Sequence, residues 1–206
     1  MTARTADRTP WLPQLLVWLV IVAAAAVRLR LLQVPLERDE GEYAYAGQLL
    51  LQGVPPYQLA FNMKFPGTYA AYALIMALFG QSIGGIHLGF LVVNAGTIIL
   101  LYLLGKRLFT AAAGAAAGAA YALLSVGAGV FGTQAHATHF VVLAALGGTL
   151  LLWQALRDQR AALLFWSGLL YGVAVLMKQH GILFAVSAAG MWCGITGAAW
   201  GTSDQG

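Results

Sequence analysis

The sequence predicts an all-α protein, a polytopic bundle of about six transmembrane helices with interfacial helices in its first outer loop. Two observations predict this class, and a third indicates where its chemistry lies. Hydrophobic residues make up 60% of the chain and charged residues only 9%, whereas a soluble domain carries about 25% charged residues. Long apolar stretches recur along almost the whole chain. The polar segment 37–43 holds four of the seven acidic residues, and acids concentrated in one place in such a chain indicate chemistry.

A helix needs about 20 apolar residues to cross a membrane. Six stretches are predicted as spans: 11–32, 86–105, 111–132, 140–156, 163–177 and 181–200. The first has a signal peptide as its alternative, because Arg4 and Arg8 precede an apolar run. That run continues through Val27 and further spans follow, so we predict an uncleaved first span.

The apolar stretch 65–79 is shorter than a helix that crosses a membrane usually is. Basic loops stay on the cytoplasmic side of a membrane. With the N-terminus inside, the basic loops at 106–107 and 157–160 also lie inside only if 65–79 does not cross. We therefore predict an interfacial or re-entrant helix there, started by Pro66.

This topology makes residues 1–206 a single membrane domain with an outer loop at 35–80. It brings polar residues from four separate loops to the outer face. These residues are Asp39, Glu40, Glu42, Lys64, His87, His136, His139, Lys178 and His180. The pattern predicts an active face on the exterior.

The acidic segment has two readings. Asp39 and Glu42 are three residues apart, so both project from one side of a helix that starts near Asp39. One reading is a solvated helix start, where acids suit the helix dipole. The other is a general base, with a second carboxylate that binds a cation or sugar hydroxyls.

The two outer lysines also have two readings. Lys64 either snorkels to lipid headgroups or neutralises a phosphate. Lys178 interrupts an apolar run, and a buried lysine there costs about 3 kcal/mol, so we place it at a span boundary, where it can face a cavity. Arg28 and Arg30, near the outer end of the first span, either snorkel outward, or one of them serves the acidic loop as a counter-ion.

The histidines give weaker signals. His136 and His139 are spaced to ligate zinc, but the sequence offers no third ligand, so a hydrogen-bonded pair is favoured. His87 is interpreted as a boundary residue only. The segment Gly114–Gly118 is rich in small residues and indicates either a dimer contact or, as we favour, close helix packing within the chain.

Several classes are excluded by what the sequence lacks. The net charge of +4 comes from scattered residues, which form no patch of the kind that binds nucleic acid. The sequence contains no Gly-rich nucleotide loop and no zinc protease motif. Cys193 is the only cysteine, so the chain forms no internal disulfide.

The ordered motifs resemble the N-terminal part of the GT-C membrane glycosyltransferases. The most similar group is the bacterial family 39-like one, with relatives of lipid A aminoarabinose transferases, protein O-mannosyltransferases and lipopolysaccharide sugar transferases. The resemblance covers most of the chain and rests on residues 36–45, 53–57, 62–69, 78–80, 101–109 and 172–181.

The resemblance implies transfer of a sugar from a polyprenyl-phosphate carrier to a lipid or glycan acceptor, usually with inversion. It implies a multi-pass protein of the bacterial inner membrane, with a cytoplasmic N-terminus, that builds lipopolysaccharide or another envelope glycan. Asp39 matches the expected base and Glu40 its paired acid. Lys64 matches the lysine of a Lys-Pro-Pro-like motif, although Phe65 replaces the first proline. Lys178 matches a second lysine that meets the donor phosphate, and the supporting residues are Glu42, Tyr43, His180, His136 and His139.

Two other functions stay open at this point. A transporter or flippase would carry charges at the bilayer midplane, whereas here they lie at span ends. A non-catalytic assembly subunit is favoured by the short length, since family members are usually longer and a truncated chain would be inactive alone. A divalent cation is the one cofactor that the pattern leaves open.

Overall fold

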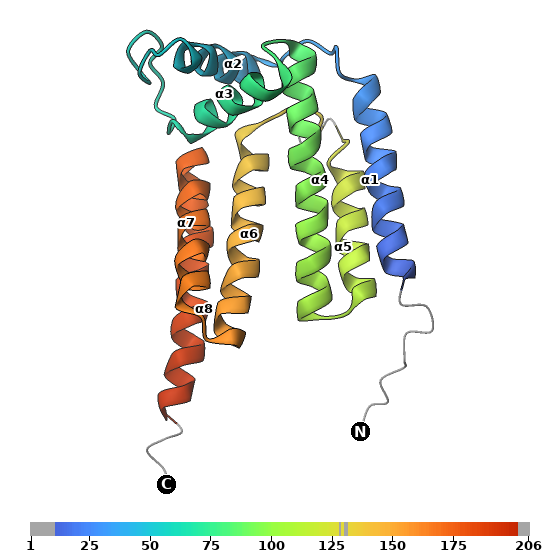
Figure 1. Ribbon diagram of the computed structural model, residues 1–206, viewed down its shortest axis with the longest axis vertical. Helices are drawn as coiled ribbons and strands as arrows, with labels where there is room; N and C mark the ends of the chain where they lie inside the picture. The colour runs from blue at the N-terminus through green and yellow to red at the C-terminus, as the bar shows by residue number, and fades with distance from the viewer. Residues whose placement is uncertain (1–10, 128, 130–131, 202–206) are drawn as a thin grey trace.

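A computed structural model describes residues 11–201 apart from 128, 130 and 131. The predicted all-α class is confirmed, because this part of the chain contains helices and no strand (Figure 1). The elements are α1 (Leu12–Arg30), α2 (Arg38–Leu51), α3 (Gly67–Phe79), α4 (Ile83–Leu108), α5 (Ala111–Leu124), α6 (Ala137–Asp158), α7 (Ala161–Met177), the 3-10 turn η2 (Gln179–Gly181) and α8 (Ile182–Gly201).

The helices form a bundle closed at one end by two helices that lie across it (Figure 1). Helices α1, α4, α5, α6, α7 and α8 run roughly alongside one another, while α2 and α3 lie over one end. We call this end the α2–α3 end. Helix α3 thus does not run with the bundle, and the interfacial or re-entrant position expected for residues 65–79 stays a prediction.

In the described part, three helices are long and apolar enough to cross a membrane: α1, α4 and α6. Two further apolar helices of the bundle are shorter, α5 with 14 residues and α7 with 17. The predicted spans are therefore supported by helix length for the first, second and fourth. Arg4 and Arg8, used for the predicted orientation, lie outside the described residues.

Helix α5 ends at Leu124 rather than at the predicted position 132. The Arg28 guanidinium donates to the Ser125 carbonyl at 2.7 Å and to the Gly132 carbonyl at 2.8 Å. These bonds hold the chain after α5 in a turn, so the helix stops. Arg28 is therefore buried and neither snorkels nor pairs with the acidic loop.

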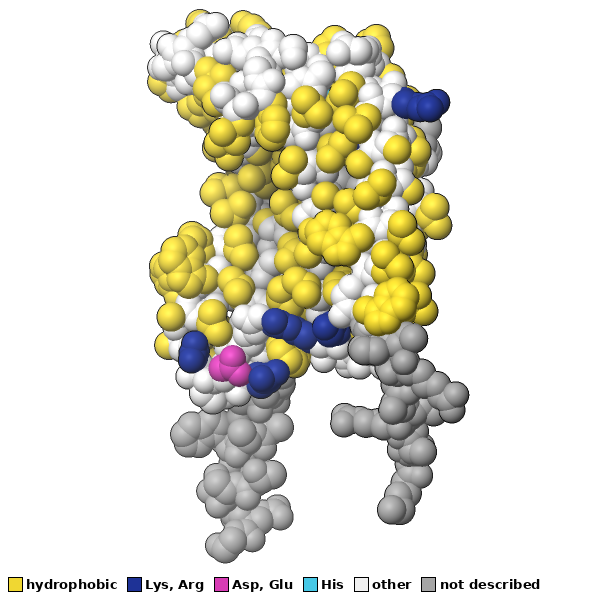
Figure 2. All heavy atoms as spheres, turned by 45° about the vertical axis from the view of Figure 1, so that its right-hand side comes forward, with side chains coloured by type: hydrophobic (Ala, Val, Ile, Leu, Met, Phe, Trp, Pro, Cys, Tyr) yellow, Lys and Arg dark blue, Asp and Glu magenta, His cyan; other side chains and the backbone are white. Residues whose placement is uncertain are grey.

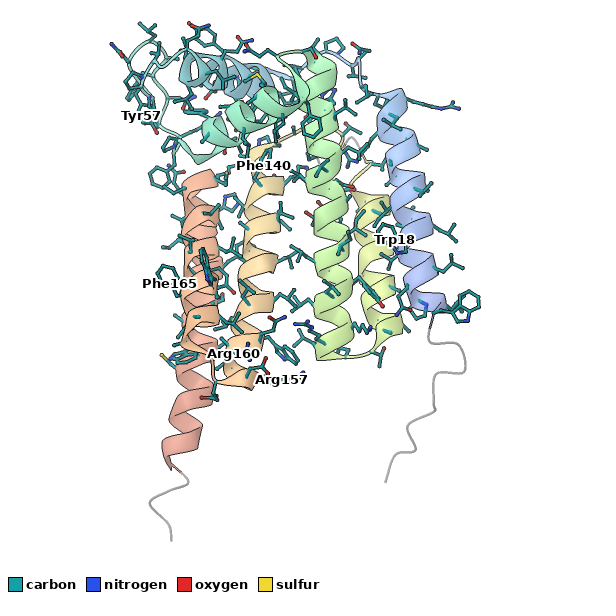
Figure 3. All side chains as sticks on the ribbon, in the orientation of Figure 1. Trp18, Tyr57, Phe140, Arg157, Arg160 and Phe165 are labelled. Carbon is teal, nitrogen blue, oxygen red and sulfur yellow. The ribbon has the colours of Figure 1, made fainter. Side chains whose placement is uncertain are left out.

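The surface supports placement in a membrane. Figure 2 shows hydrophobic side chains over the length of the helices and most of the visible Lys and Arg at the end opposite α2 and α3. Figure 3 places Arg157 and Arg160 at that opposite end. The predicted separation of the acidic loop from the basic loops is thus present in the fold.

The Gly114–Gly118 segment packs within the chain. A Cβ at Gly114 would collide with the backbone of Tyr102 and Lys106 on α4, and one at Gly118 would touch Ile98. The close α4–α5 contact thus explains the small residues, and the alternative of a dimer contact loses its support.

Helices α2 and α3 pack on a separate hydrophobic core, which lies between them and the ends of α4 and α6. Its aromatic members stack, with Tyr43 edge-on to Tyr72 at 5.5 Å between ring centroids. Phe140, at the start of α6, lies 6.0 Å from Tyr72 and points up beneath α3 (Figure 3). This core fixes α2 and α3 on the bundle, because Tyr72 also donates to the Ala135 carbonyl at 2.7 Å.

The start of α3 lies directly against the end of α7. A Cβ on Gly67 would lie 2.5 Å from the Leu176 carbonyl oxygen, so only glycine permits this approach. The neighbouring Thr68 hydroxyl donates to the Met177 carbonyl at 2.7 Å. The contact brings the segment before α3 next to Lys178.

Gly67→Ala is expected to lower the free energy of unfolding by about 1–3 kcal/mol, because the new methyl group forces two backbones apart. Thermal unfolding in detergent measures this loss. The matched control is Gly168→Ala in α7, where a Cβ meets nothing within 4 Å and alanine improves helix propensity. Equal stability of the two variants would contradict the close contact.

Candidate active site

Glu40 joins three parts of the chain at the α2–α3 end. The carboxylate is 1% exposed and accepts hydrogen bonds from the backbone N–H of Glu37, at 3.0 Å, and of Ala135. The His87 imidazole lies 3.6 Å from the oxygen that Ala135 contacts. Glu37 caps α2 in return by accepting from the Asp39 N–H, so a reciprocal capping box starts the helix.

Asp39 lies at the opening of this helix with its side chain 21% exposed. One of its carboxylate oxygens is 3.5 Å from the Lys64 ammonium and 3.4 Å from the His136 imidazole. The other oxygen is 3.6 Å from Arg38, whose side chain is almost fully exposed. Asp39 therefore faces a shared polar space rather than the protein core.

Lys64 is the cation at the centre of this cluster. Its ammonium group donates to Glu42 at 2.9 Å and lies 4.7 Å over the Tyr43 ring. The other oxygen of Glu42 accepts from the Tyr69 hydroxyl. Tyr57 holds the backbone beside the lysine by donating to the Lys64 carbonyl at 2.7 Å.

A cavity of about 160 Å³ opens beside Lys64. It has room for a phosphate group or several waters, since one water takes about 30 Å³. Lys178 lines it from the end of α7 and makes no ion pair with any described acid. The residues lining it are Tyr43, Lys64, Phe65, Thr68, Ala137, Met177, Lys178 and Gln179.

The predicted histidines separate in the structure. His136 contacts Asp39 and Thr138, while His139 contacts Tyr121 and lies edge-on to the Phe90 ring. His180 is exposed on η2, two residues past Lys178. Within the described chain no group of three or more His, Cys, Asp or Glu is placed to hold a metal.

The neighbouring charges set the protonation states. Partial burial alone would raise the pKa of Asp39, but Lys64 and His136 together hold it below its usual range. Burial would lower the pKa of Lys64, but Glu42 and the other acids raise it, so the ammonium stays charged. Burial and then Lys178 lower the pKa of His136, against the opposing effect of Asp39.

A neutral His136 suits its contact with Asp39. An ionised carboxylate only accepts hydrogen bonds. The neutral His136 ring can therefore donate to Asp39 when its proton is on Nε2. Nδ1 then accepts from the Thr138 hydroxyl, 3.1 Å away. The site at neutral pH thus combines an ionised carboxylate, a neutral imidazole and a charged ammonium group.

Sequence reasoning missed two contacts that position the site. His87, interpreted as a boundary residue only, bridges Glu40 and the Leu32 carbonyl. Gln179 donates to the Met63 carbonyl and ties η2 to the segment that carries Lys64. The Glu37-x-x-Glu40 spacing was the available signal for the capping box, whereas nothing in the sequence pairs Gln179 with Met63.

Residues 63–201 match a protein family described as dolichyl-phosphate-mannose-protein mannosyltransferase. This is more than half of the chain. The chain belongs to this family. Searches of curated proteins and of solved structures return no match.

Family membership identifies a membrane glycosyltransferase of the GT-C type, of mannosyltransferase kind, with a lipid-linked donor. It favours this function over the transporter and the assembly subunit. Lys64 and Lys178 lie inside the matched range, while Asp39, Glu40 and Glu42 precede it. The fold, through the contacts of Lys64 and Ala135, is what brings the acids to the matched region.

Glu40→Gln is expected to lower the unfolding free energy by about 2–4 kcal/mol, because an amide leaves a buried backbone donor without its acceptor. Chemical denaturation in detergent measures this. Glu42→Gln is the control, and it should cost less than about 1 kcal/mol, as partly exposed ion pairs do. Similar losses would contradict a structural role for the buried carboxylate.

Comparing the wild type with Glu40→Gln also tests how the free energy of unfolding depends on pH. Burial would raise the pKa of Glu40, but His87 and the backbone donors lower it below the usual value. Its stabilising contribution is then present above the unfolded pKa and lost as the pH falls through the folded one. The wild type should lose stability below about pH 4, and Glu40→Gln should lose less over that range.

Proposed function

We propose that this protein transfers a sugar from a polyprenyl-phosphate carrier to an acceptor hydroxyl at the outer face of a bacterial inner membrane. The observation that carries the proposal is the cluster of Asp39, Lys64 and His136 beside the cavity that Lys178 lines. It combines a carboxylate for the acceptor with cations for a phosphate. Family membership supports the lipid-linked donor.

In the proposed reaction the acceptor oxygen attacks the anomeric carbon from the side opposite the phosphate. The bond between that carbon and the phosphate oxygen breaks, and the configuration inverts. The acceptor proton passes to the Asp39 carboxylate, which acts as general base. The polyprenyl phosphate leaves with the bonding electrons, and its charge needs a nearby cation.

We assign the phosphate to the cavity, with Lys178 as its first contact and Lys64 as its second. Lys64 is already shared between Asp39 and Glu42, whereas Lys178 has no described acid partner. A phosphate that draws Lys64 toward the cavity also takes a cation away from Asp39. The pKa of Asp39 then rises, and the base strengthens only when the donor is bound.

Glu40 is proposed as a positioning residue. Its oxygens are engaged by two backbone N–H groups and approached by His87, so it orients the first turn of α2 and with it Asp39. Tyr43 lines the cavity, Glu42 holds Lys64, and His136 orients Asp39. Among the described interactions, neither His139 nor His180 contacts the Asp39 carboxylate.

A second cavity supports a lipid-linked donor. It measures about 420 Å³, lies between α6, α7 and α8, and has an almost wholly apolar lining. Its lining includes Val175 on α7, two residues before Met177, which lines the cavity next to Lys64. No charged residue lines the larger cavity, so we assign it to the apolar lipid part of the donor and not to the sugar-transfer step.

Asp39→Asn is expected to abolish sugar transfer, because the amide cannot accept the acceptor proton, while folding and membrane insertion are retained. Transfer of a radiolabelled sugar from a polyprenyl-phosphate donor in proteoliposomes measures the rate. Arg38→Gln is the control, since Arg38 is the adjacent exposed charge and its loss should leave most of the activity. Undiminished transfer by Asp39→Asn would remove Asp39 as the base.

A further inference from the structure

The segment that carries Lys64 presents two different faces. From Ala60 to Phe65, half-buried and exposed residues alternate along the segment. Ala60, Asn62 and Lys64 are half-buried and face the protein. The intervening Phe61 and Met63 are 81% and 82% exposed, and Phe65 is 40% exposed. One face of the segment therefore holds the lysine, and the other presents Phe61 and Met63, which we call the apolar row. Phe65 lies at its edge, because it also lines the cavity beside Lys64.

The apolar row is unusual for a surface in contact with water. Leaving a Phe or Met side chain in water forgoes the favourable free energy of burying it, and contiguous apolar patches mark interaction sites. Leu59 is also exposed on the same segment, so the patch extends toward Tyr57. The segment carries no acid, and its single cation turns inward.

The apolar row lies at the height where the apolar helix α7 ends. Gln179, just past α7, donates to the Met63 carbonyl at 3.1 Å, and Phe65 shares a cavity wall with Met177. Figure 1 shows the α2–α3 connection above the end of α7, and Figure 3 places Tyr57 at its outer edge. The adjoining turns of α7 and α8 expose Leu176, Ile182 and Leu183.

This position indicates what covers the apolar row. Exposed side chains on α7 and α8 face lipid if the bundle spans the membrane, and the row continues that surface at the helix ends. Segments that lie at the boundary between acyl chains and headgroups bury large apolar side chains such as Phe and Leu there. A lipid surface fits a patch that is apolar, uncharged and continuous with the lipid-facing side of the bundle.

We infer that Phe61 and Met63 insert into the membrane at the boundary between acyl chains and headgroups. The lipid then holds the outer face of the segment while Asp39 and Glu42 hold Lys64 on its inner face. The position of the lysine depends on the membrane as well as on the protein. The inference goes beyond the proposed function, because it concerns a lipid contact and needs no sugar transfer.

The test is site-directed spin labelling in lipid nanodiscs. Cys193 is the only cysteine, so Cys193→Ser gives a clean background. A nitroxide is attached at Met63→Cys, with Phe61→Cys as a second site. The control is Tyr45→Cys, whose exposed side chain shares a face of α2 with Arg38, seven residues earlier.

The measured quantity is collision of each label with oxygen, which concentrates in lipid, and with a water-soluble nickel chelate. Labels at positions 61 and 63 should be mobile, with higher oxygen and lower nickel accessibility than the label at 45. Nickel accessibility equal to that at 45 would place the row in water and overturn the inference. Immobilised labels shielded from both reagents would also overturn it, because a protein would then cover the row.

Discussion

The arrangement of the α2–α3 end depends on one buried carboxylate. Removing an ionised Glu40 from water is unfavourable unless hydrogen bonds replace its hydration. Glu37, Ala135 and His87 supply these contacts from the start of α2, the α5–α6 connection and α4. Because the three parts must meet around this group, α2 lies across the bundle and Asp39 faces the segment that follows it.

Around this fixed point the other charges are arranged by how much water each one keeps. Asp39, Glu42 and Lys64 stay partly exposed, so a substrate can reach them. Arg28 instead is buried and holds the turn after α5, which leads to Ala135 and His136. Buried charges thus set the backbone, and half-exposed charges are left for binding and chemistry.

The sequence predicted the fold class and the gathering of polar loops at one end, because apolar length and basic loops follow from the bilayer itself. The predicted topology placed Lys64 on the same face as the acids, and family resemblance alone gave the lysine a phosphate to bind. The sequence could not predict the role of Glu40 or of Arg28, since the residue type alone does not distinguish a buried charged side chain from a solvated one. The predicted end of α5, at residue 132, was wrong for the same reason. The contact at the observed end of the helix comes from Arg28, nearly a hundred residues earlier in the chain.

The central claim is that charged groups from separate segments share one face of the membrane. Single cysteines at Arg38→Cys, Gln179→Cys and Arg157→Cys, each in the Cys193→Ser background, test it with a membrane-impermeant maleimide on sealed vesicles. Positions 38 and 179 should react from the same side and position 157 only from the other. Helix α2 lies over one end of the bundle, Gln179 contacts Met63 in the α2–α3 connection, and Arg157 lies at the opposite end. Reaction of positions 38 and 179 from opposite sides would contradict the account.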